Sequence, residues 1–307
     1  MSFHETETGT LEVAAPAAPG LRVVQNRKYG QWISGAIVVV VLVAFVNAIA
    51  TNDSIRWEVI AEYLAYPTIL SGLWTTVWLT VVSLIIGVIG GIVLAVMRMS
   101  KNVVLFAVSG AYIWFFRGTP LLVQLLLWYN LALFFPRLGL GALSVDTNVF
   151  ITPVMAALLA LALNEAAYMA EIVRGGILAV HPGQKEAGSA LGMPHGAVLR
   201  RIVLPQAMKV VIPPAGNELI TLLKMTSLVA VIGAGDLLTN AQYIGTRDFT
   251  PMEMLLVATV WYLLLTTIAT IGQYLLERRL MRSSTRTARR PLLRQWLRNL
   301  TPDRVRP

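Results

Sequence analysis

Cysteine is absent from this sequence of 307 residues, which excludes disulfide bonds and cysteine-ligated metal sites. Charged residues are scarce at 13% of the chain, whereas 56% of it is hydrophobic and the mean hydropathy is +0.66. Soluble domains typically carry about 25% charged residues. The nucleotide-binding pattern Gly-x4-Gly-Lys-Ser/Thr is also missing, so we do not expect this chain to hydrolyse ATP by itself. These absences favour a membrane protein without a catalytic nucleotide site.

Long apolar runs stand where a soluble protein would carry its charges. A helix that crosses a bilayer needs about 20 mostly apolar residues, whereas barrel strands need only about 10. Six windows have the length of a helix: 32–50, 69–97, 119–136, 150–173, 209–233 and 252–276. We therefore predict an all-α integral membrane protein with about six transmembrane helices.

The distribution of Lys and Arg predicts the orientation of these helices. A net charge of +9 could indicate nucleic acid binding, but the basic residues flank the apolar windows instead. If the N-terminus is cytoplasmic, they gather on the same side in 98–117, in 174–209 and after residue 277. Only Arg56, Arg137 and Arg247 fall on the other side. By the positive-inside rule both termini are predicted to be cytoplasmic, with no nucleic acid partner.

The longest cytoplasmic loop, 175–209, has a pattern that indicates more than a connection. Pro182 is suited to open a helix, and Gly192 is suited to end it. Between them, Ala187 and Gly188 form a small-residue face that would allow a partner's surface to approach closely. An ordinary helical connection is the alternative. The pattern favours a helix that docks on a partner.

A specific resemblance supports docking. Glu186-Ala187-Gly188, then Gly192, then Leu204-Pro205 resembles the EAA loop of permeases in ATP-binding cassette (ABC) importers. In that family the loop seats in a cleft of a separate ATPase subunit. The resemblance therefore implies docking roles for Glu186, Ala187, Gly188, Gly192, Leu204 and Pro205. This sequence departs from the family in having Gly188 where alanine is usual.

Three more segments resemble the polar amino acid branch of these permeases, which includes histidine and glutamine importers. They are Phe116–Gln124, Ala167–Gly176 and Lys224–Leu228. In the last, Met225 stands where the family often carries Asp or Asn. The resemblance covers roughly residues 65–282.

The resemblance also divides the chain into parts. A permease core is expected over 65–282, preceded by an extra transmembrane helix over 31–51. Residues 1–30 are expected to form a disordered cytoplasmic tail. Residues 283–307 form a basic cytoplasmic tail, for which an interfacial amphipathic helix and a solvated segment both remain open.

The resemblance implies a translocation subunit and not an enzyme, in the inner cell membrane. Its partners would be an ATPase subunit that binds ATP and Mg, an extracytoplasmic solute-binding protein, and a second permease copy or a homologue. This chain itself would bind no cofactor and no metal. Basic, amide and acidic amino acids all remain open as solutes. A channel or an ion-coupled secondary transporter is the alternative function, although neither requires an EAA loop.

Polar residues within the spans are candidates for the substrate pathway, because burying them in a membrane is costly. At 100° per residue, Asn164, Tyr168 and Glu171 lie on one side of the fourth span, with Glu165 beside them. We predict that Asn164 and Glu165 face the pathway. For Glu171, pairing with Arg174 three residues later is favoured over contact with substrate.

Two further patterns concern the fifth and second spans. Lys224 could attract a carboxylate on a substrate or pair with an acid on a neighbouring helix, and the sequence leaves both open. Glu218 lies about 120° away around the helix, too far for a good pair with Lys224. Gly87 and Gly91 form a Gly-x3-Gly face, for which packing within the subunit is favoured over a dimer contact.

Overall fold

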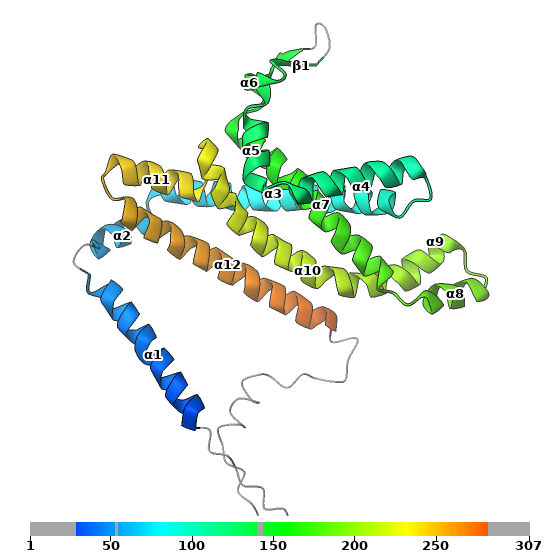
Figure 1. The fold of residues 1–307 in the computed structure, drawn as a ribbon, viewed down its shortest axis with the longest axis horizontal. Coiled ribbons are helices and arrows are strands. Elements are labelled where there is room, and N and C mark those ends of the chain that lie inside the picture. Colours follow the sequence, from blue (N-terminus) through cyan, green and yellow to red (C-terminus); the bar gives the residue numbers. More distant parts are fainter. Residues whose placement is uncertain (1–28, 53–54, 140–143, 282–307) are drawn as a thin grey trace, which may run out of the picture. The chain divides into compact units, whose positions relative to one another are not determined.

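A computed structural model of the chain describes residues 29–52, 55–139 and 144–281. In these ranges the regular structure is helical except for one two-stranded antiparallel hairpin, which confirms the predicted all-α fold (Figure 1). The tails beyond these ranges lie outside the described residues. The elements in chain order are α1 (Tyr29–Ala50), α2 (Trp57–Leu64), α3 (Pro67–Arg98), α4 (Val103–Gly118), α5 (Leu121–Tyr129), η1 (Leu131–Leu133), β1 (Arg137–Leu138), β2 (Val145–Asp146), α6 (Thr147–Phe150), α7 (Pro153–Leu178), α8 (Pro182–Ala190), α9 (His195–Val198), η3 (Leu199–Val203), α10 (Leu204–Met225), η4 (Thr226–Ile232), α11 (Leu237–Arg247) and α12 (Pro251–Met281).

Helix α1 belongs to a separate unit, residues 1–55. Its apolar window, Trp32–Ala50, is long enough to cross a membrane, and none of it is buried. A helix that is apolar on every side is suited to lipid or to a large core. These features fit the extra transmembrane helix expected over 31–51.

The second unit, from Arg56 onward, holds the other candidate spans. Four helical runs qualify by length and composition: Pro67–Arg98, Pro153–Leu178, His195–Ile232 and Pro251–Leu280. The pair α4 and α5 counts as one further broken span. With α1, the described residues therefore contain up to six spans, which confirms the predicted number.

The third span differs from the continuous window predicted over 119–136. Helix α4 already begins at Val103, and the chain bends by 102° between α4 and α5. Proline disfavours helical backbone in the residue before it, and Thr119, before Pro120, has extended φ and ψ of −112° and 141°. Arg117 therefore belongs to the end of a membrane helix and not to the predicted cytoplasmic loop.

The fifth span also begins earlier than predicted. The window at 209–233 is the second part of a helical run that extends from His195 to Ile232. About half of the expected cytoplasmic loop at 175–209 therefore belongs to the long helices on either side of α8: the end of α7 before α8, and α9, η3 and the start of α10 after it. Only the segment around α8 lies outside these long helices.

Glycines let α3 and α7 approach closely. A Cβ atom on Gly87 would lie 2.4 Å from Cγ of Glu165, and one on Gly91 would lie 2.4 Å from Cβ of Met169. Both distances are far below van der Waals contact, so no other residue fits at either position without a shift. The Gly-x3-Gly face therefore packs within the subunit, as the sequence favoured.

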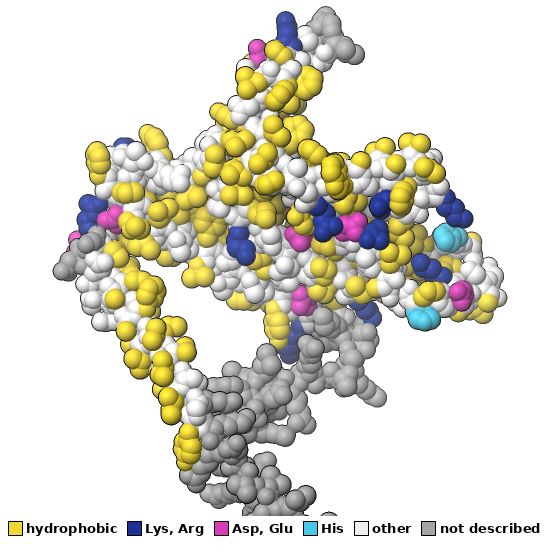
Figure 2. Space-filling view, viewed as in Figure 1, with side chains coloured by type: hydrophobic (Ala, Val, Ile, Leu, Met, Phe, Trp, Pro, Cys, Tyr) yellow, Lys and Arg dark blue, Asp and Glu magenta, His cyan; other side chains and the backbone are white. Residues whose placement is uncertain are grey.

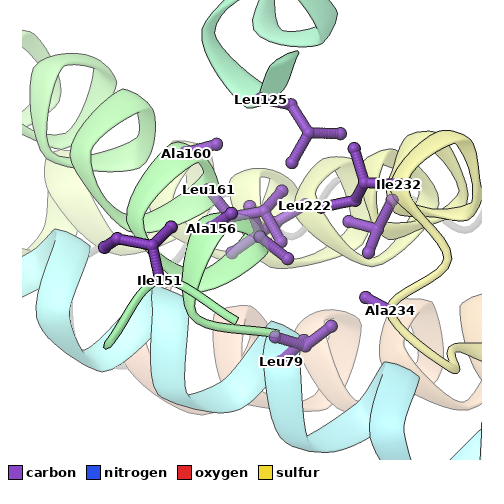
Figure 3. Close-up of a cluster of buried hydrophobic side chains, with 11 residues drawn as sticks. Leu79, Leu125, Ile151, Ala156, Ala160, Leu161, Leu222, Ile232 and Ala234 are labelled. Atoms are coloured by element: carbon purple, nitrogen blue, oxygen red, sulfur yellow. The ribbon is translucent and has the colours of Figure 1, made fainter. Parts of the chain in front are cut away.

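The apolar core lies where α3, α5, α7 and α10 meet. Leu79, Leu125, Leu161 and Leu222, one from each helix, are fully or almost fully buried in a single cluster (Figure 3). Because α5 contributes Leu125, this cluster fixes the helix that follows the bend. The core therefore holds both sides of the broken span.

Helix α2 is attached to the corner between α11 and α12. Arg56 Nε donates to Glu253 Oε1 at 2.8 Å, and the Tyr63 hydroxyl donates to Asp248 Oδ2 at 2.8 Å. In the second unit this corner lies at the opposite end from α8 (Figure 1).

Candidate functional site

The predicted docking segment centres on α8, and its first turn follows from two residues. Pro182 occupies the first helical position. An N–H group there would have no acceptor within the helix, so the lack of one in proline costs no hydrogen bond. The preceding His181 caps the helix, since its Nδ1 accepts a hydrogen bond from the N–H of Gly183 at 3.1 Å. The helix therefore begins where the sequence predicted.

Glycine ends α8 through a left-handed turn. Gly192 has φ of +72°, a conformation that L side chains rarely adopt. The N–H of Met193 donates to the carbonyl of Gly188 at 3.1 Å, and that of Gly192 donates to Ser189 at 2.9 Å. These two bonds form a Schellman motif, which satisfies carbonyl groups left open at a helix end. The predicted end of α8 therefore depends on Gly192.

One side of α8 packs against its own chain. Gly188 is buried, and a Cβ atom there would lie 3.0 Å from both Ile202 Cδ1 and Val198 Cγ2. Around it, Val180, Val198, Val203 and Ala207 form a small apolar cluster. The small size of Gly188 therefore makes room for residues of the same chain. The sequence pattern predicted the surface of a partner in this space.

The other side of α8 is uncovered. Glu186 and Ala187 are exposed, and Leu191, just after the helix, is 81% exposed. A carboxylate, a small residue and a large apolar side chain thus stand together on a surface that the chain itself does not cover. This arrangement suits contact with a protein partner.

Leu204 and Pro205 lie at the junction between this segment and the membrane. Both are exposed, in the first turn of α10. Proline has no N–H to continue a helical ladder, but the preceding turn, η3, is a π-helix in which the N–H of Leu204 donates to the carbonyl of Leu199. The wider turn lets the helix continue, so residues that pack on α8 belong to the same run as the fifth span.

Asn164 holds the bend in the broken span. Its side chain is buried, and Nδ2 donates to the carbonyl of Phe116 at 2.9 Å and to Gln124 Oε1 at 3.3 Å. The amide of Gln124 in turn donates to Phe116 and Thr119. Because the bend leaves carbonyl groups without helical partners, these side chains replace the lost bonds. The described contacts of Asn164 are thus to protein groups at the bend.

Glu165 is the most deeply buried of the candidate acids. It is 4% exposed, and its Oε1 has no hydrogen-bond partner in the described structure. Its Cβ and Cγ fill the space that Gly87 leaves on α3. Glu218 of α10 is close enough to act on it electrostatically. This carboxyl oxygen is therefore buried without a partner among the described residues.

Glu171 and Tyr168 each contact an arginine. Arg174 Nη2 donates to Glu171 Oε2 at 2.6 Å, and this is the pair that the sequence favoured. The guanidinium carbon of Arg117 lies 5.2 Å from the centre of the Tyr168 ring. Arg117 also acts electrostatically on Glu171 and on Glu218. Figure 2 shows basic and acidic side chains gathered on the surface in this part of the bundle.

Lys224 is exposed near the end of α10 and forms no ion pair within the described part of the chain. Glu218 is half-buried and likewise forms none among the residues described. The two residues therefore do not pair with each other, as their spacing predicted.

Two residues of this region were not assigned roles from the sequence. Gln124 and Arg117 both lie in the segment Phe116–Gln124, which the resemblance singled out without explaining. Gln124 contacts Asn164 and Arg117 contacts Tyr168, both of which are distant in sequence, so only the fold reveals these contacts. As for metals, no group of three or more His, Asp or Glu side chains that could hold an ion occurs among the described residues.

The chain is similar to known transport proteins over most of its length. The sequence profile of a family described as "Binding-protein-dependent transport system inner membrane component" matches residues 87–282. The arginine transport system permease protein ArgU of Corynebacterium glutamicum is 44% identical over 263 residues, which are 85% of this chain and 83% of the relative. The arginine transport system permease protein ArtQ of Bacillus subtilis is 41% identical over 214 residues, which are 70% of this chain and 93% of the relative.

A solved structure is similar to this chain in both sequence and fold. The structure titled "Crystal structure of an amino acid ABC transporter with histidines" contains a chain that is 38% identical in sequence. The match covers 73% of the present chain and 99% of that chain, with a TM-score of 0.65.

Proposed function

This chain belongs to the family of binding-protein-dependent transport system inner membrane components, and from that premise we propose that it imports a cationic amino acid of the arginine class. It is the membrane-spanning permease subunit of an ABC importer. It is not an enzyme, because ATP hydrolysis in such importers belongs to a separate subunit. Family membership implies an ATPase, a solute-binding protein and a paired permease as partners.

The observation that carries the substrate class is the unpaired carboxyl group of Glu165 with Glu218 beside it. Two acids within the bundle, neither in an ion pair among the described residues, provide a complement for a guanidinium or ammonium group. Holding a carboxylate charge at such a depth without a partner is costly, so a cationic ligand would favour the charged form of these acids. The arginine permeases ArgU and ArtQ, as relatives, support the same class.

Coupling to ATP is proposed to pass through α8. Its exposed side, with Glu186 and Ala187, would seat in the ATPase subunit, which binds ATP and Mg. Its buried side rests on Val198 and Ile202, which belong to the run that enters the membrane as α10. ATPase closure would therefore move α8 and α10 together. Differential binding of nucleotide to two states of the complex would supply the driving force.

The orientation and the division of the chain are part of the proposal. Both termini are assigned to the cytoplasm because this side then receives most Lys and Arg residues. The core is assigned to residues 65–282, with α1 as an addition and with cytoplasmic tails over 1–30 and 283–307.

Uptake by the complete importer tests this proposal. The chain, its ATPase and its binding protein are reconstituted in liposomes, and uptake of labelled arginine, glutamine and glutamate is measured with and without ATP. We expect ATP-dependent uptake of arginine in preference to the other two. Uptake that is independent of ATP would instead favour a channel or a secondary transporter.

A variant tests the role of the acids. Glu165→Gln at an unchanged membrane level is expected to reduce arginine uptake by about tenfold or more, because it removes a charge-assisted contact. Glu62→Gln, in the exposed part of α2, makes the same chemical change far from the site and serves as control. Undiminished uptake by Glu165→Gln would refute this role.

A further inference from the structure

Arg117 occupies an unusual place for a charged residue. It lies one residue before the end of α4, within the broken span formed by α4 and α5. Charged side chains at membrane depth are rare, and those that occur face a bundle interior or a water-filled route. Arg117 therefore needs a reason to be there.

Within the described ranges, the contacts of Arg117 do not use its hydrogen-bond donors. Its guanidinium group lies over the ring of Tyr168 at 5.2 Å and forms no ion pair among the residues that the structure describes. Glu171, on which its charge acts, is already held by Arg174 through contacts of 2.6 and 3.2 Å. The ring contact fixes the guanidinium without using the N–H groups that would bind an anion.

The surroundings of Arg117 carry charges that match an amino acid. Its charge acts on Glu218 of α10, and Glu218 acts on the buried Glu165 of α7. A cation and two acids on three different helices are therefore close enough for Arg117 to act on Glu218, and Glu218 on Glu165. An amino acid presents charges in sequence, a carboxylate and then an ammonium group, with a further cation in the arginine class.

We propose that Arg117 binds the α-carboxylate group of the transported amino acid. The inference rests on the proposed function, since it assigns a further contact in the same pathway. The planar guanidinium group matches a carboxylate with two parallel hydrogen bonds. Glu218 then faces the α-ammonium group, and Glu165 the cationic end of the side chain. The bend that places Arg117 is held by Asn164 and Gln124, so these two are positioning residues.

Ligand binding to the permease–ATPase complex in nanodiscs, without binding protein, tests this assignment. Arginine is compared with L-argininamide, which keeps the side chain and replaces the carboxylate with a neutral amide. Wild type is expected to bind arginine about tenfold or more tightly than argininamide, because charge-assisted hydrogen bonds are stronger than neutral ones. Arg117→Gln should lower arginine affinity to that of argininamide and leave argininamide affinity nearly unchanged. Arg117→Lys should fall between, since an ammonium group is a point charge.

The outcomes separate this inference from the proposed substrate. Arg117→Gln that weakens arginine and argininamide alike would overturn the inference, since that result is expected of a residue that only supports the bend. Equal affinity of wild type for both compounds would overturn it too. If wild type fails to bind arginine but binds glutamine, the cationic substrate class is contradicted, and the same comparison with glutamine and its α-amide decides the role of Arg117. Arg137→Gln, in the β1–β2 hairpin, is the matched control and should leave every ratio unchanged.

Discussion

Replacing Gly192 with alanine would show whether the ATPase recognises α8 in the form seen here. Gly192 has φ of +72°, and an added Cβ would meet no atom within 4 Å, so backbone strain is the only direct cost. That strain is about 1–2 kcal/mol for a residue other than glycine. If only the folded form of α8 docks, the penalty lowers the population of the competent state and appears in the affinity. The ATPase should then bind about 5- to 30-fold more weakly.

The assay is a titration of the purified ATPase subunit onto the permease in nanodiscs. Gly196→Ala is the matched control, because Gly196 also has open space around it but lacks a left-handed φ. It should leave the dissociation constant nearly unchanged. Gly192→Asn should have a smaller effect than Gly192→Ala, since asparagine tolerates the left-handed region better. The reasoning fails if Gly192→Ala and Gly196→Ala bind the ATPase equally well.

Three further predictions concern separate parts of the chain. Glu186→Arg should abolish co-purification of the ATPase from native membranes, and full recovery would contradict docking through α8. Gly91→Ala should destabilise the permease by about 1–3 kcal/mol in thermal unfolding because of overpacking, whereas Gly175→Ala, with open space around it, should not. The guanidinium of Arg247 lowers the pKa of Asp248 from 3.8 to about 2. A carboxyl group with a lowered pKa stabilises the fold above its unfolded pKa and loses that effect as the pH falls. The unfolding temperatures of wild type and Asp248→Asn should therefore differ by a constant amount between pH 5 and 8 and converge only in the range from about 4 to 2, and a changing difference near neutral pH would contradict this assignment.

Apolar length predicted the number of spans, and glycine spacing predicted that α3 packs closely within the subunit, since both depend on composition within a single helix. The broken span was misplaced because Arg117 is the second-to-last residue of the helix Val103–Gly118 and Pro120 follows soon after, so the sequence there resembles a basic loop followed by a helix start. Only tertiary contacts reveal that the two pieces form one span. Similarly, Pro205 marks a helix start in the sequence, whereas a π turn before it joins two helices into one run.

In the candidate sites too, the sequence predicted the local features and missed the contacts between distant residues. The start and end of α8 followed from Pro182 and Gly192, because capping is local. The Glu171–Arg174 pair was predicted for the same reason. The environment of Asn164 was not, because its partners Phe116 and Gln124 lie 48 and 40 residues away. The side on which Gly188 is packed likewise depends on Val198 and Ile202, which belong to the helices that follow α8.

The glycine contacts between α3 and α7 also limit how this protein can move. Gly87 and Gly91 bring α3 directly against α7, so a large rotation or slide of either helix would place a bulkier residue in space that only glycine fits. Bending is easier in α10, where Pro213 and Pro214 interrupt the helical hydrogen bonds. Glu165 lies on α7, whereas Glu218 lies on α10 beyond the two prolines, so bending of α10 at Pro213 and Pro214 would change the separation of the two carboxyl groups.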